Sequence, residues 1–529
     1  MTWRSYLLLA VLGLAVMLLV AAFQSTPGYM DADAYYAGGR QLATGQGFTE
    51  PFLWNYLDNP VGFPHPSNAY WMPLASLLVA AGAKLFGPGS WSAARLGFLV
   101  VAMAIPPLTA ALAWSFSPRR DLAFTAGLLA VFPVFYLPFL PVTDTFGLYT
   151  LFGGIFFLLL KRRPASTSRL SYLTSSFFLG LLAGLMHLAR ADGLLWLLLA
   201  MGAIIFVMPK PALRLFLDTF FGLLVGVMGY LLIMAPWFSR NHSAFGTLLA
   251  PGGVKMLWLT SYDQLFAYPA SQLTFSAWWQ SGIAAILKAR IWSLGLNLGS
   301  TLAVQAEIFL LPLIILGLWH LRRDRRVQLA VLAWLVTLIA MTALFPFAGA
   351  RGGFFHSGAA LQIVWWAMAP LGLERLIEWG RRRRGWNAAQ AGQVFRSALV
   401  GLAVFMTAFI FWTRIVGMGG SPAWDQESNA YSRVNKYLIS QGATCSDVVM
   451  VANPPGYYLA SGNTSIAVPD GDLNNLLVVA KKYNAVYLVL EQGSVPAALL
   501  SAYEKPNGQA DLTYLSQIGN MRIFRLPHH

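Results

Sequence analysis

Long apolar runs recur along the whole chain and are separated by short polar stretches. Each run is near 20 residues, the length that an α-helix needs to cross the hydrocarbon core of a bilayer. This pattern predicts a polytopic α-helical membrane protein with about eleven spans. The expected spans are 5–24, 91–116, 122–140, 146–160, 171–188, 193–207, 215–237, 301–319, 327–345, 358–373 and 398–413.

Dense groups of Lys and Arg lie between particular pairs of runs and set the expected orientation. Cytoplasmic loops carry an excess of these residues. An even number of expected spans separates Arg4, 161–163, 322–326 and 381–384 from one another, so all four can lie on the cytoplasmic side. The N-terminus is then cytoplasmic, in a multi-pass protein of the cell membrane. This even count holds only if the apolar segment 70–87 does not cross the membrane and lies along the outer surface as an interfacial helix.

Two long stretches fall on the outer side in this topology. The first long loop, 25–91, is rich in Gly and Pro and is expected to be loop with short helices. The second long loop, 238–300, carries several tryptophans, which favour the membrane–water interface. We therefore divide the chain into a transmembrane module, 1–416, and a remainder, 417–529.

The remainder has a different pattern, in which short apolar strands alternate with amphipathic segments. Such alternation predicts a small α/β domain, and the topology places it outside the cytoplasm. From Asp425 onward it is roughly 105 residues long, which is enough to form a core of its own. The expected helices are 425–440 and 472–483, and the expected strands are 447–452, 485–490, 512–515 and 522–526.

Composition supports the membrane assignment and narrows the chemistry. Charged residues make up 11% of the chain, against about 25% in soluble domains. The net charge of +15 does not indicate nucleic-acid binding, because the cations gather in short loops as cytoplasmic loops require. The sequence has no Gly-rich phosphate loop after a strand. Outward-facing chemistry would then need a substrate that is already activated in the lipid.

Acidic residues are scarce, yet Asp31 and Asp33 stand one residue apart directly after the first span. Like charges this close raise each other's pKa, so such a pair is usually kept for chemistry or for a cation. The functional interpretation is a general base, or a base plus a metal ligand. The alternative is a solvated pair that caps a helix starting near Ala34. Asp144 lies at the tip of a hairpin on the same side, where it could also cap the helix 146–160.

Several cations are expected on this outer side. Arg190 suits phosphate, which arginine holds through two parallel hydrogen bonds, although it could simply pair with a nearby acid. Arg351 and His356 form a second cationic point, where the intervening Gly-Gly would let backbone N–H groups approach an anion. Snorkelling is the alternative for Arg351. Lys84 and His65 are further candidates for substrate binding, with an interface anchor and an ordinary loop histidine as the alternatives.

The order of motifs near the N-terminus resembles the GT-C superfamily of membrane glycosyltransferases. The similarity is to the branch of protein O-mannosyltransferases and bacterial lipid A aminoarabinose transferases, in which the stretch before Leu-Phe-Gly is a periplasmic juxtamembrane helix. It is specific over about 1–240 and looser to about 415. The motifs are the first span, Asp-Ala-Asp before Tyr35-Tyr36, Leu-Ala-Thr-Gly at 42–45, Tyr70-Trp71, Lys-Leu-Phe-Gly at 84–87 and Arg95.

This resemblance implies inverting transfer of a sugar from a polyprenyl-phosphate donor to an acceptor outside the cytoplasm. The first-loop acid of the family corresponds to Asp31 or Asp33, the base that deprotonates the acceptor hydroxyl, and we favour Asp31. The second-loop acid corresponds to Asp144, which would bind substrate or, with Asp33, a divalent cation such as Mg²⁺ or Mn²⁺. Phosphate-binding cations correspond to Arg190 or Arg351. Related enzymes often have adjacent Asp-Glu in place of Asp-Ala-Asp, which leaves the identity of the base open.

Two other classes of protein fit parts of the pattern. A transporter or flippase of a lipid-linked glycan would place ionisable residues or broken helices within the membrane, whereas the ionisable residues of this chain gather at loop ends. A scaffold whose C-terminal domain binds a partner would not depend on the outer acids. The acids and cations on one side therefore favour the glycosyltransferase, with polyprenyl-phosphate sugar, membrane lipid and an unidentified acceptor as its partners.

Overall fold

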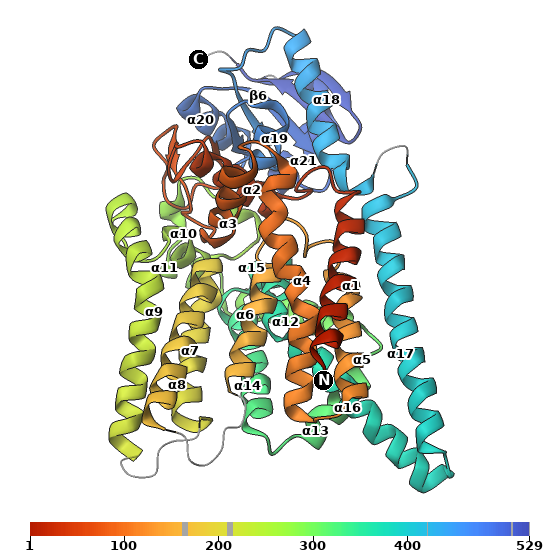
Figure 1. Ribbon diagram of the computed structural model, residues 1–529. Helices are drawn as coiled ribbons and strands as arrows, with labels where there is room; N and C mark the ends of the chain where they lie inside the picture. The colour runs from red at the N-terminus through yellow and green to blue at the C-terminus, as the bar shows by residue number, and fades with distance from the viewer. Residues whose placement is uncertain (161–167, 209–214, 420–421, 509–510, 528–529) are drawn as a thin grey trace.

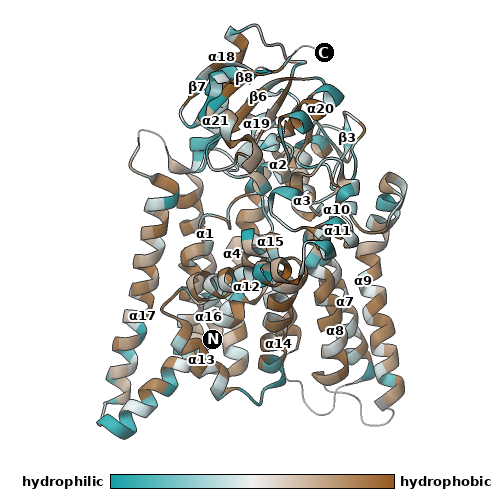
Figure 2. Cartoon of the chain, turned by 180° about the vertical axis from the view of Figure 1, so that it is seen from behind, coloured by the Kyte–Doolittle hydropathy of each residue, from teal (hydrophilic) through white to brown (hydrophobic). Residues whose placement is uncertain are grey.

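The computed structural model describes residues 1–160, 168–208, 215–419, 422–508 and 511–527. A bundle of long helices makes up most of the molecule, and a smaller α/β domain sits on one end of it (Figure 1). Hydrophobic residues dominate the helices of the bundle, while hydrophilic residues gather on the domain and at the opposite helix ends (Figure 2). This distribution is that of a multi-pass membrane protein.

Each of the eleven expected spans contains a helix, and among the described residues six helices are long and apolar enough to cross a membrane. The number of eleven spans stays a prediction. The six are α1 (Trp3–Ala21), α4 (Trp91–Phe116), α7 (Arg169–Ala189), α9 (Leu215–Phe245), α14 (Arg325–Ile339) with η7 (Ala340–Leu344), and α17 (Ala388–Ile410) with η9 (Phe411–Val416). The other expected spans contain α5 (Arg120–Val131), α6 (Phe146–Leu159), α8 (Leu194–Phe206), α13 (Leu311–His320) and α16 (Phe354–Arg384).

The cationic clusters lie where the orientation argument needs them, as far as the structure describes them. The turn between α13 and α14, which carries 322–326, and the end of α16, which carries 381–384, lie at the end of the bundle away from the α/β domain (Figure 1). The cluster 161–163 falls outside the described residues. The side of the membrane on which the domain lies stays a prediction.

Glycines allow the bundle helices to pack closely. A Cβ atom added at Gly180 of α7 would lie 1.7 Å from the carbonyl oxygen of Gly226 in α9, and one added at Gly153 of α6 would lie 1.9 Å from that of Ala360 in α16. Small residues at such contacts let backbones approach where lipid offers no hydrophobic driving force. The N-terminal half of α16, which packs against α6 at Gly153, is almost entirely buried.

The first long loop has more regular structure than expected. It contains α2 (Met30–Ala43), α3 (Leu74–Phe86) and the short strands β1 (Thr49–Glu50), β2 (Phe52–Leu53) and β3 (His65–Pro66). With 13 residues, α3 is too short to span a bilayer, as the interfacial interpretation of 70–87 requires. Both helices lie between the bundle and the α/β domain (Figure 1).

The second long loop begins later and is more helical than predicted. The α9 helix continues to Phe245 through Pro236, instead of ending at residue 237. Helices α10 (Pro251–Lys255) and α11 (Phe275–Gln280) follow, and α12 occupies Ile283–Ser300. The stretch predicted as the second long outer loop, 238–300, thus contains the 18-residue helix α12 at its end.

The C-terminal domain is built on a six-stranded sheet with the strand order β2-β5-β4-β6-β8-β7. One face is covered by α20 (Leu473–Tyr483) and α21 (Leu500–Glu504), and the other by α18 (Gln426–Ser440) and α19 (Pro454–Ser461). The four predicted strands and both predicted helices are present, within a few residues. They are β4 (Val448–Val451), β6 (Ala485–Glu491), β7 (Thr513–Ile518) and β8 (Met521–Arg525), with α18 and α20.

The edge strand β2 belongs to the first long loop. Its residues Phe52 and Leu53 pair in parallel with Ser465 and Ile466 of β5 (Ser465–Ala467). The hydroxyl of Tyr56 also donates a hydrogen bond to the carbonyl oxygen of Ala467. The C-terminal sheet is thus completed by a strand that the chain forms near its other end, which a local hydrophobic pattern does not reveal.

Candidate functional site

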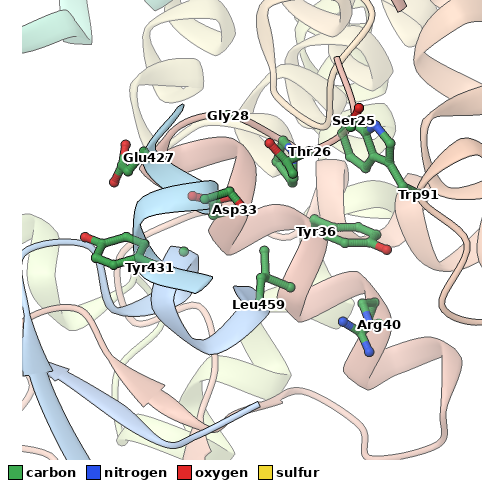
Figure 3. A pocket seen from close by; sticks show the side chains of 13 residues that line it. Ser25, Thr26, Gly28, Asp33, Tyr36, Arg40, Trp91, Glu427, Tyr431 and Leu459 are labelled. Atoms are coloured by element: carbon green, nitrogen blue, oxygen red, sulfur yellow. The ribbon is translucent and has the colours of Figure 1, made fainter. Parts of the chain in front are cut away.

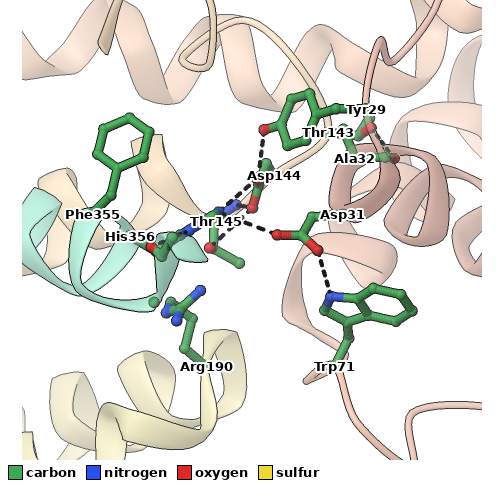
Figure 4. A network of polar contacts seen from close by, with 12 residues as sticks. Tyr29, Asp31, Ala32, Trp71, Thr143, Asp144, Thr145, Arg190, Phe355 and His356 are labelled. Carbon is green, nitrogen blue, oxygen red and sulfur yellow. Dashed lines mark hydrogen bonds and ion pairs between the residues drawn. The ribbon is translucent and has the colours of Figure 1, made fainter. Parts of the chain in front are cut away.

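Three of the predicted site residues converge at the junction of the bundle and the α/β domain. Asp31 lies in the first turn of α2, Asp144 just before α6, and His356 in the first turn of α16. Their candidate ligand atoms all lie within 4.8 Å of one another. His356 Nε2 is 3.1 Å from Asp144 Oδ2 and 3.5 Å from Asp31 Oδ2 (Figure 4). Elements from three distant parts of the chain therefore build one polar centre.

Asp144 is the buried and well-satisfied member of this centre. It accepts hydrogen bonds from the Tyr29 hydroxyl (2.5 Å), the Thr145 backbone N–H (2.5 Å) and the Thr145 hydroxyl (3.1 Å). Burial by itself would raise the pKa of Asp144, but His356, Tyr29 and the Thr145 N–H outweigh it and hold that pKa below its ordinary value. Asp144 is thus kept as an anion.

Asp31 has the opposite environment. Burial, partly opposed by His356 and reinforced by the charge of Asp144, raises the pKa of Asp31 above its ordinary value. Its Oδ1 accepts a hydrogen bond of 3.0 Å from the indole N–H of Trp71, and its side chain keeps 33% of its surface exposed. Two neighbouring carboxylates with pKa values shifted in opposite directions are suited to different roles.

Asp31 opens into a cavity of about 420 Å³, which also contains both predicted phosphate-binding arginines. Arg190 pairs with Asp192 through Nε at 2.9 Å, and its guanidinium points toward Asp144 and His356 (Figure 4). Arg351 lies in a kinked segment before α16, with its guanidinium 4.5 Å from the centre of the Tyr262 ring. The cavity is therefore acidic on one wall and cationic on another.

Asp33 does not join this centre. It lies on the opposite side of α2, where its Oδ2 accepts a hydrogen bond of 2.9 Å from Asn453 of the C-terminal domain. A separate cavity of about 200 Å³ is lined by Asp33, Glu427 and Tyr36 among others (Figure 3). Burial and the nearby charge of Glu427 raise the pKa of Asp33 well above its ordinary value. The structure thus separates Asp33 from Asp144, contrary to the metal pair predicted from sequence.

Two further predicted residues lie away from the large cavity. His65 is buried between Glu50 and Asp58, at 3.3 and 2.9 Å, and these two acids raise its pKa to about 9 although burial opposes them. A histidine paired in this way fixes the fold of the first long loop. Lys84 is exposed in the last turn of α3 and does not line the large cavity.

The sequence interpretation missed the side chains that hold the centre in place. Tyr29 and Trp71 donate to Asp144 and Asp31. Asp192, the nearby acid that was expected to pair with Arg190, does so and also accepts from the hydroxyl of Ser357 (2.7 Å). The only available signal was local: Tyr29 stands next to the acidic motif, and Trp71 belongs to the Tyr-Trp pair used only for the family resemblance.

The three convergent residues fit a divalent cation. Two carboxylates and an imidazole nitrogen are ligands that suit Mn²⁺ or Zn²⁺. The His356 Nδ1–H donates to the Gly352 carbonyl oxygen (3.0 Å), which turns Nε2 toward the carboxylates, as in metal-ligating histidines with a fixed tautomer. The candidate ligand set is therefore Asp31, Asp144 and His356, in place of Asp33 and Asp144.

No protein-family model and no curated protein sequence matches the chain, but solved structures do. The oligosaccharyltransferase of Archaeoglobus fulgidus, tethered with an acceptor peptide, aligns with a TM-score of 0.59 at 14% identity, over 99% of this chain and 74% of that one. ArnT of Cupriavidus metallidurans, bound to undecaprenyl phosphate, aligns with a TM-score of 0.55 at 12% identity, over 98% and 97%. The archaeal enzyme has also been solved with Zn and sulfate, at a TM-score of 0.58.

These alignments extend over nearly the whole chain, including the α/β domain. Both neighbours are glycosyltransferases of the GT-C type, so the predicted GT-C fold is confirmed. The chain is a multi-pass membrane protein with this fold and with a carboxylate–histidine centre at the base of its C-terminal domain.

Proposed function

We propose that this protein transfers a glycosyl group from a polyprenyl-phosphate-linked donor to an acceptor at the extracytoplasmic face of the membrane. The observation that carries the proposal is the large cavity, because Asp31 and both predicted phosphate-binding arginines line it together with His356. Asp144 is 3.1 Å from His356 Nε2. Structural neighbours that bind undecaprenyl phosphate or a dolichol-phosphate support the class of donor. In the proposed orientation the α/β domain and this cavity lie outside the cytoplasm.

Asp31 serves as the general base in this proposal. Its Oδ1 accepts one hydrogen bond from Trp71 and, as a carboxylate oxygen, retains a second lone pair for the acceptor hydroxyl. The acceptor oxygen forms a bond to the anomeric carbon while its proton passes to Asp31. The bond from that carbon to the phosphate oxygen breaks, and its electron pair leaves with the phosphate, so the anomeric configuration inverts. The raised pKa of Asp31 favours this role, because a general base works best when its pKa lies near the operating pH.

The arginines stabilise the charge that develops on the leaving phosphate. Arg190 is held by Asp192, which fixes the direction of its guanidinium, and Arg351 approaches the same cavity from the segment before α16. Preorganised donors of this kind act where charge accumulates in the transition state. A divalent cation held by Asp31, Asp144 and His356 would supply further Lewis-acid neutralisation of the phosphate.

The direct test is donor turnover by the purified protein. We expect it to release polyprenyl phosphate from a short-chain polyprenyl-phosphate sugar, in a reaction that depends on the acceptor. A panel of hexose and pentose donors, tested with lipid, glycan and peptide acceptors, identifies the substrates. A correctly folded preparation that turns over no donor in this panel would contradict the proposal.

A flippase of a lipid-linked glycan is the second candidate, and one observation favours it. Glu307 is fully buried within the expected span 301–319, where the helix is broken and both Glu307 and Ile308 have left-handed backbone angles. Its carboxylate accepts a hydrogen bond of 2.7 Å from the Trp366 indole. Ionisable groups at helix breaks are a property of transporters. Loss of lipid-linked glycan translocation in Glu307→Gln, with donor turnover absent in wild type, would favour this candidate.

A further inference from the structure

The C-terminal domain contacts the short segment that carries Asp31 at two places, one before and one after Asp31 in the sequence. One contact precedes α2 and involves residues 25–28, and the other lies two residues after Asp31, at Asp33. Both contacts bury polar groups and join parts of the chain about 400 residues apart. Neither is needed to close the large cavity, whose lining comes from the bundle and the two long loops.

The first contact is made by Trp424 and Asp425, at the start of the domain. Asp425 is 4% exposed and accepts hydrogen bonds from the backbone N–H groups of Ser25 (3.2 Å) and Thr26 (3.0 Å), and from the Thr26 hydroxyl (2.7 Å). The Trp424 indole donates to the Thr26 carbonyl oxygen at 3.0 Å. Hydrogen bonds to a carboxylate are stronger than those between neutral groups, so the chain entering α2 is firmly fixed.

Glycine is required at this first contact. Gly28 has a φ of +92°, and a Cβ added there would lie 2.2 Å from the Trp424 ring. The left-handed conformation and the absence of a side chain let the backbone pass directly over the indole. Tyr29, the next residue, also packs edge-on against Trp424, with ring centres 5.8 Å apart, and it donates to Asp144.

The second contact is made by Asn453, the N-cap of α19. Its side-chain N–H₂ donates to Asp33 Oδ2 (2.9 Å) and to Glu427 Oε1 (2.8 Å), and its Oδ1 accepts from the Gly456 N–H (3.0 Å). A Cβ added at Gly456 would lie 2.8 Å from Asp33 Oδ2, so α19 and α2 approach as closely as their backbones allow. The Asn453 side chain therefore links α2, through Asp33, to Glu427 and to the N-terminus of α19.

This second contact continues into the sheet. The Asn453 backbone N–H donates to the Tyr431 hydroxyl (3.2 Å), which donates to Glu491 Oε1 (2.5 Å) at the end of β6. Glu491 also accepts from the Ala452 N–H (3.2 Å). Burial raises the pKa of Glu491 to about 7. The hydrogen-bonded chain thus runs from α2 to the central strand of the domain.

Helix geometry explains why Asp31 and Asp33, two positions apart, contact different parts of the molecule. Residues advance by about 100° per position in an α-helix, so Asp31 and Asp33 point about 160° apart. We propose that the C-terminal domain positions Asp31, with Asn453, Asp33 and Asp425 as positioning residues that set the place and angle of the first turn of α2. This proposal rests on the proposed function, because it takes Asp31 as the base. A displacement of about 1 Å at such a group can cost about 100-fold in rate.

The test compares variants that break the second contact with variants that keep it. Asp33→Ala removes the acceptor oxygen, whereas Asp33→Asn retains an oxygen for the Asn453 amide. Asn453→Ser retains a capping oxygen for α19 but loses the amide donor. The matched control is Asn387→Ser, which alters the N-cap of α17 at the far end of the bundle.

We expect Asp33→Ala and Asn453→Ser to lower kcat for donor turnover by about 10- to 100-fold, with little change in KM for either substrate. Asp33→Asn should restore most of the loss, and Asn387→Ser should behave as wild type. A residue that acts as the base would not be rescued by asparagine. Equal loss in Asp33→Ala and Asp33→Asn, or full activity in Asn453→Ser, would overturn the proposal.

A second measurement separates this proposal from the proposed function. Amide hydrogen exchange of residues 25–43 should become about tenfold faster in Asp33→Ala and Asn453→Ser, since each loses the buried hydrogen bond between Asn453 and Asp33. It should stay at the wild-type rate in the control. Faster exchange in a protein without donor turnover would support positioning and contradict glycosyl transfer. Unchanged exchange in both variants would overturn positioning, whatever the activity.

Discussion

Replacing Asp31 by asparagine should abolish transfer while preserving the fold. Asparagine has the same shape as aspartate, and its side-chain oxygen can still accept the Trp71 indole N–H at Oδ1. It cannot take up the acceptor proton. The cavity, the arginines and the residues that bind Asp144 are all unaltered, so the substitution removes the proton acceptor and one carboxylate of the candidate cation site, with little loss of packing.

The expected changes in turnover and in stability can each be estimated. A positioned general base contributes about 10²- to 10⁴-fold, which corresponds to about 3 to 5 kcal/mol of transition-state free energy. Stability should not fall in parallel. The carboxylates of Asp31 and Asp144 approach within 4.8 Å, and like charges at about this distance repel by about 3 kcal/mol at an effective dielectric constant near 20, less where water enters the cavity. The variant loses this repulsion together with a weak contact to His356.

The assay measures polyprenyl phosphate released per unit time from saturating donor, together with the thermal unfolding midpoint. We expect kcat to fall at least about 100-fold with the midpoint at or above that of wild type. Asp472→Asn is a matched control, because asparagine also caps α20. Wild-type turnover in Asp31→Asn would refute its role as base. A large drop in the midpoint would instead mean that Asp31 is needed for folding.

Three further predictions test the electrostatics of the site and of the domain. Burial and the charge of Asp144 raise the pKa of Asp31, so the protein assayed without added divalent cation should lose activity, as Asp31 is protonated, at a higher pH than an ordinary aspartate would cause; kcat/KM then rises with pH along an acidic limb that a pH–rate profile locates. Arg190→Lys should raise KM for the donor by about tenfold and lower kcat, because an ammonium cannot hold phosphate in a bidentate manner; an unchanged KM would exclude a phosphate contact. The folded domain favours the protonated form of Glu491 and raises its pKa from 4.5 to about 7, so stability should decline as pH rises from the lower to the higher of these values and then level off. Unfolding midpoints measured at about pH 5 and about pH 8, on either side of this window, should therefore differ less in Glu491→Gln than in wild type.

The sequence was sufficient for the helical bundle and for part of the site. Apolar runs and cationic loops located the helices, and an acid at a hairpin tip marked Asp144. The helix in the first long loop was expected to start near Ala34, but α2 starts at Met30. That difference of four residues places both acids inside a helix. Asp31 and Asp33 point to opposite sides because successive residues of a helix are rotated about its axis. The chain just before α2 is held by hydrogen bonds to Trp424 and Asp425, which a local pattern does not contain.

The remaining parts of the site depend on contacts between distant residues. His356 meets Asp144 because α16 packs against α6 through Gly153, and such a contact has no signature in either segment alone. His65, which pairs with Glu50, is a residue that the sequence suggested for the site and that the fold uses elsewhere. A histidine in a polar loop was a candidate for substrate binding, yet the short ladder of β1 and β3 places it between two acids. Burial, which determines these roles, is a property of the assembled fold.

The parallel pairing of β2 with β5 also has a consequence for biosynthesis. Tyr56 and its partner Ala467 are 411 residues apart, and at about 5 to 20 residues per second the ribosome needs about 20 to 80 s to make the intervening chain. During that time β2 presents an unpaired edge, which is prone to wrong association. The first long loop cannot reach its final structure until the last part of the chain has emerged. A chain truncated before β5 would therefore insert its helices in the membrane and still lack an ordered site.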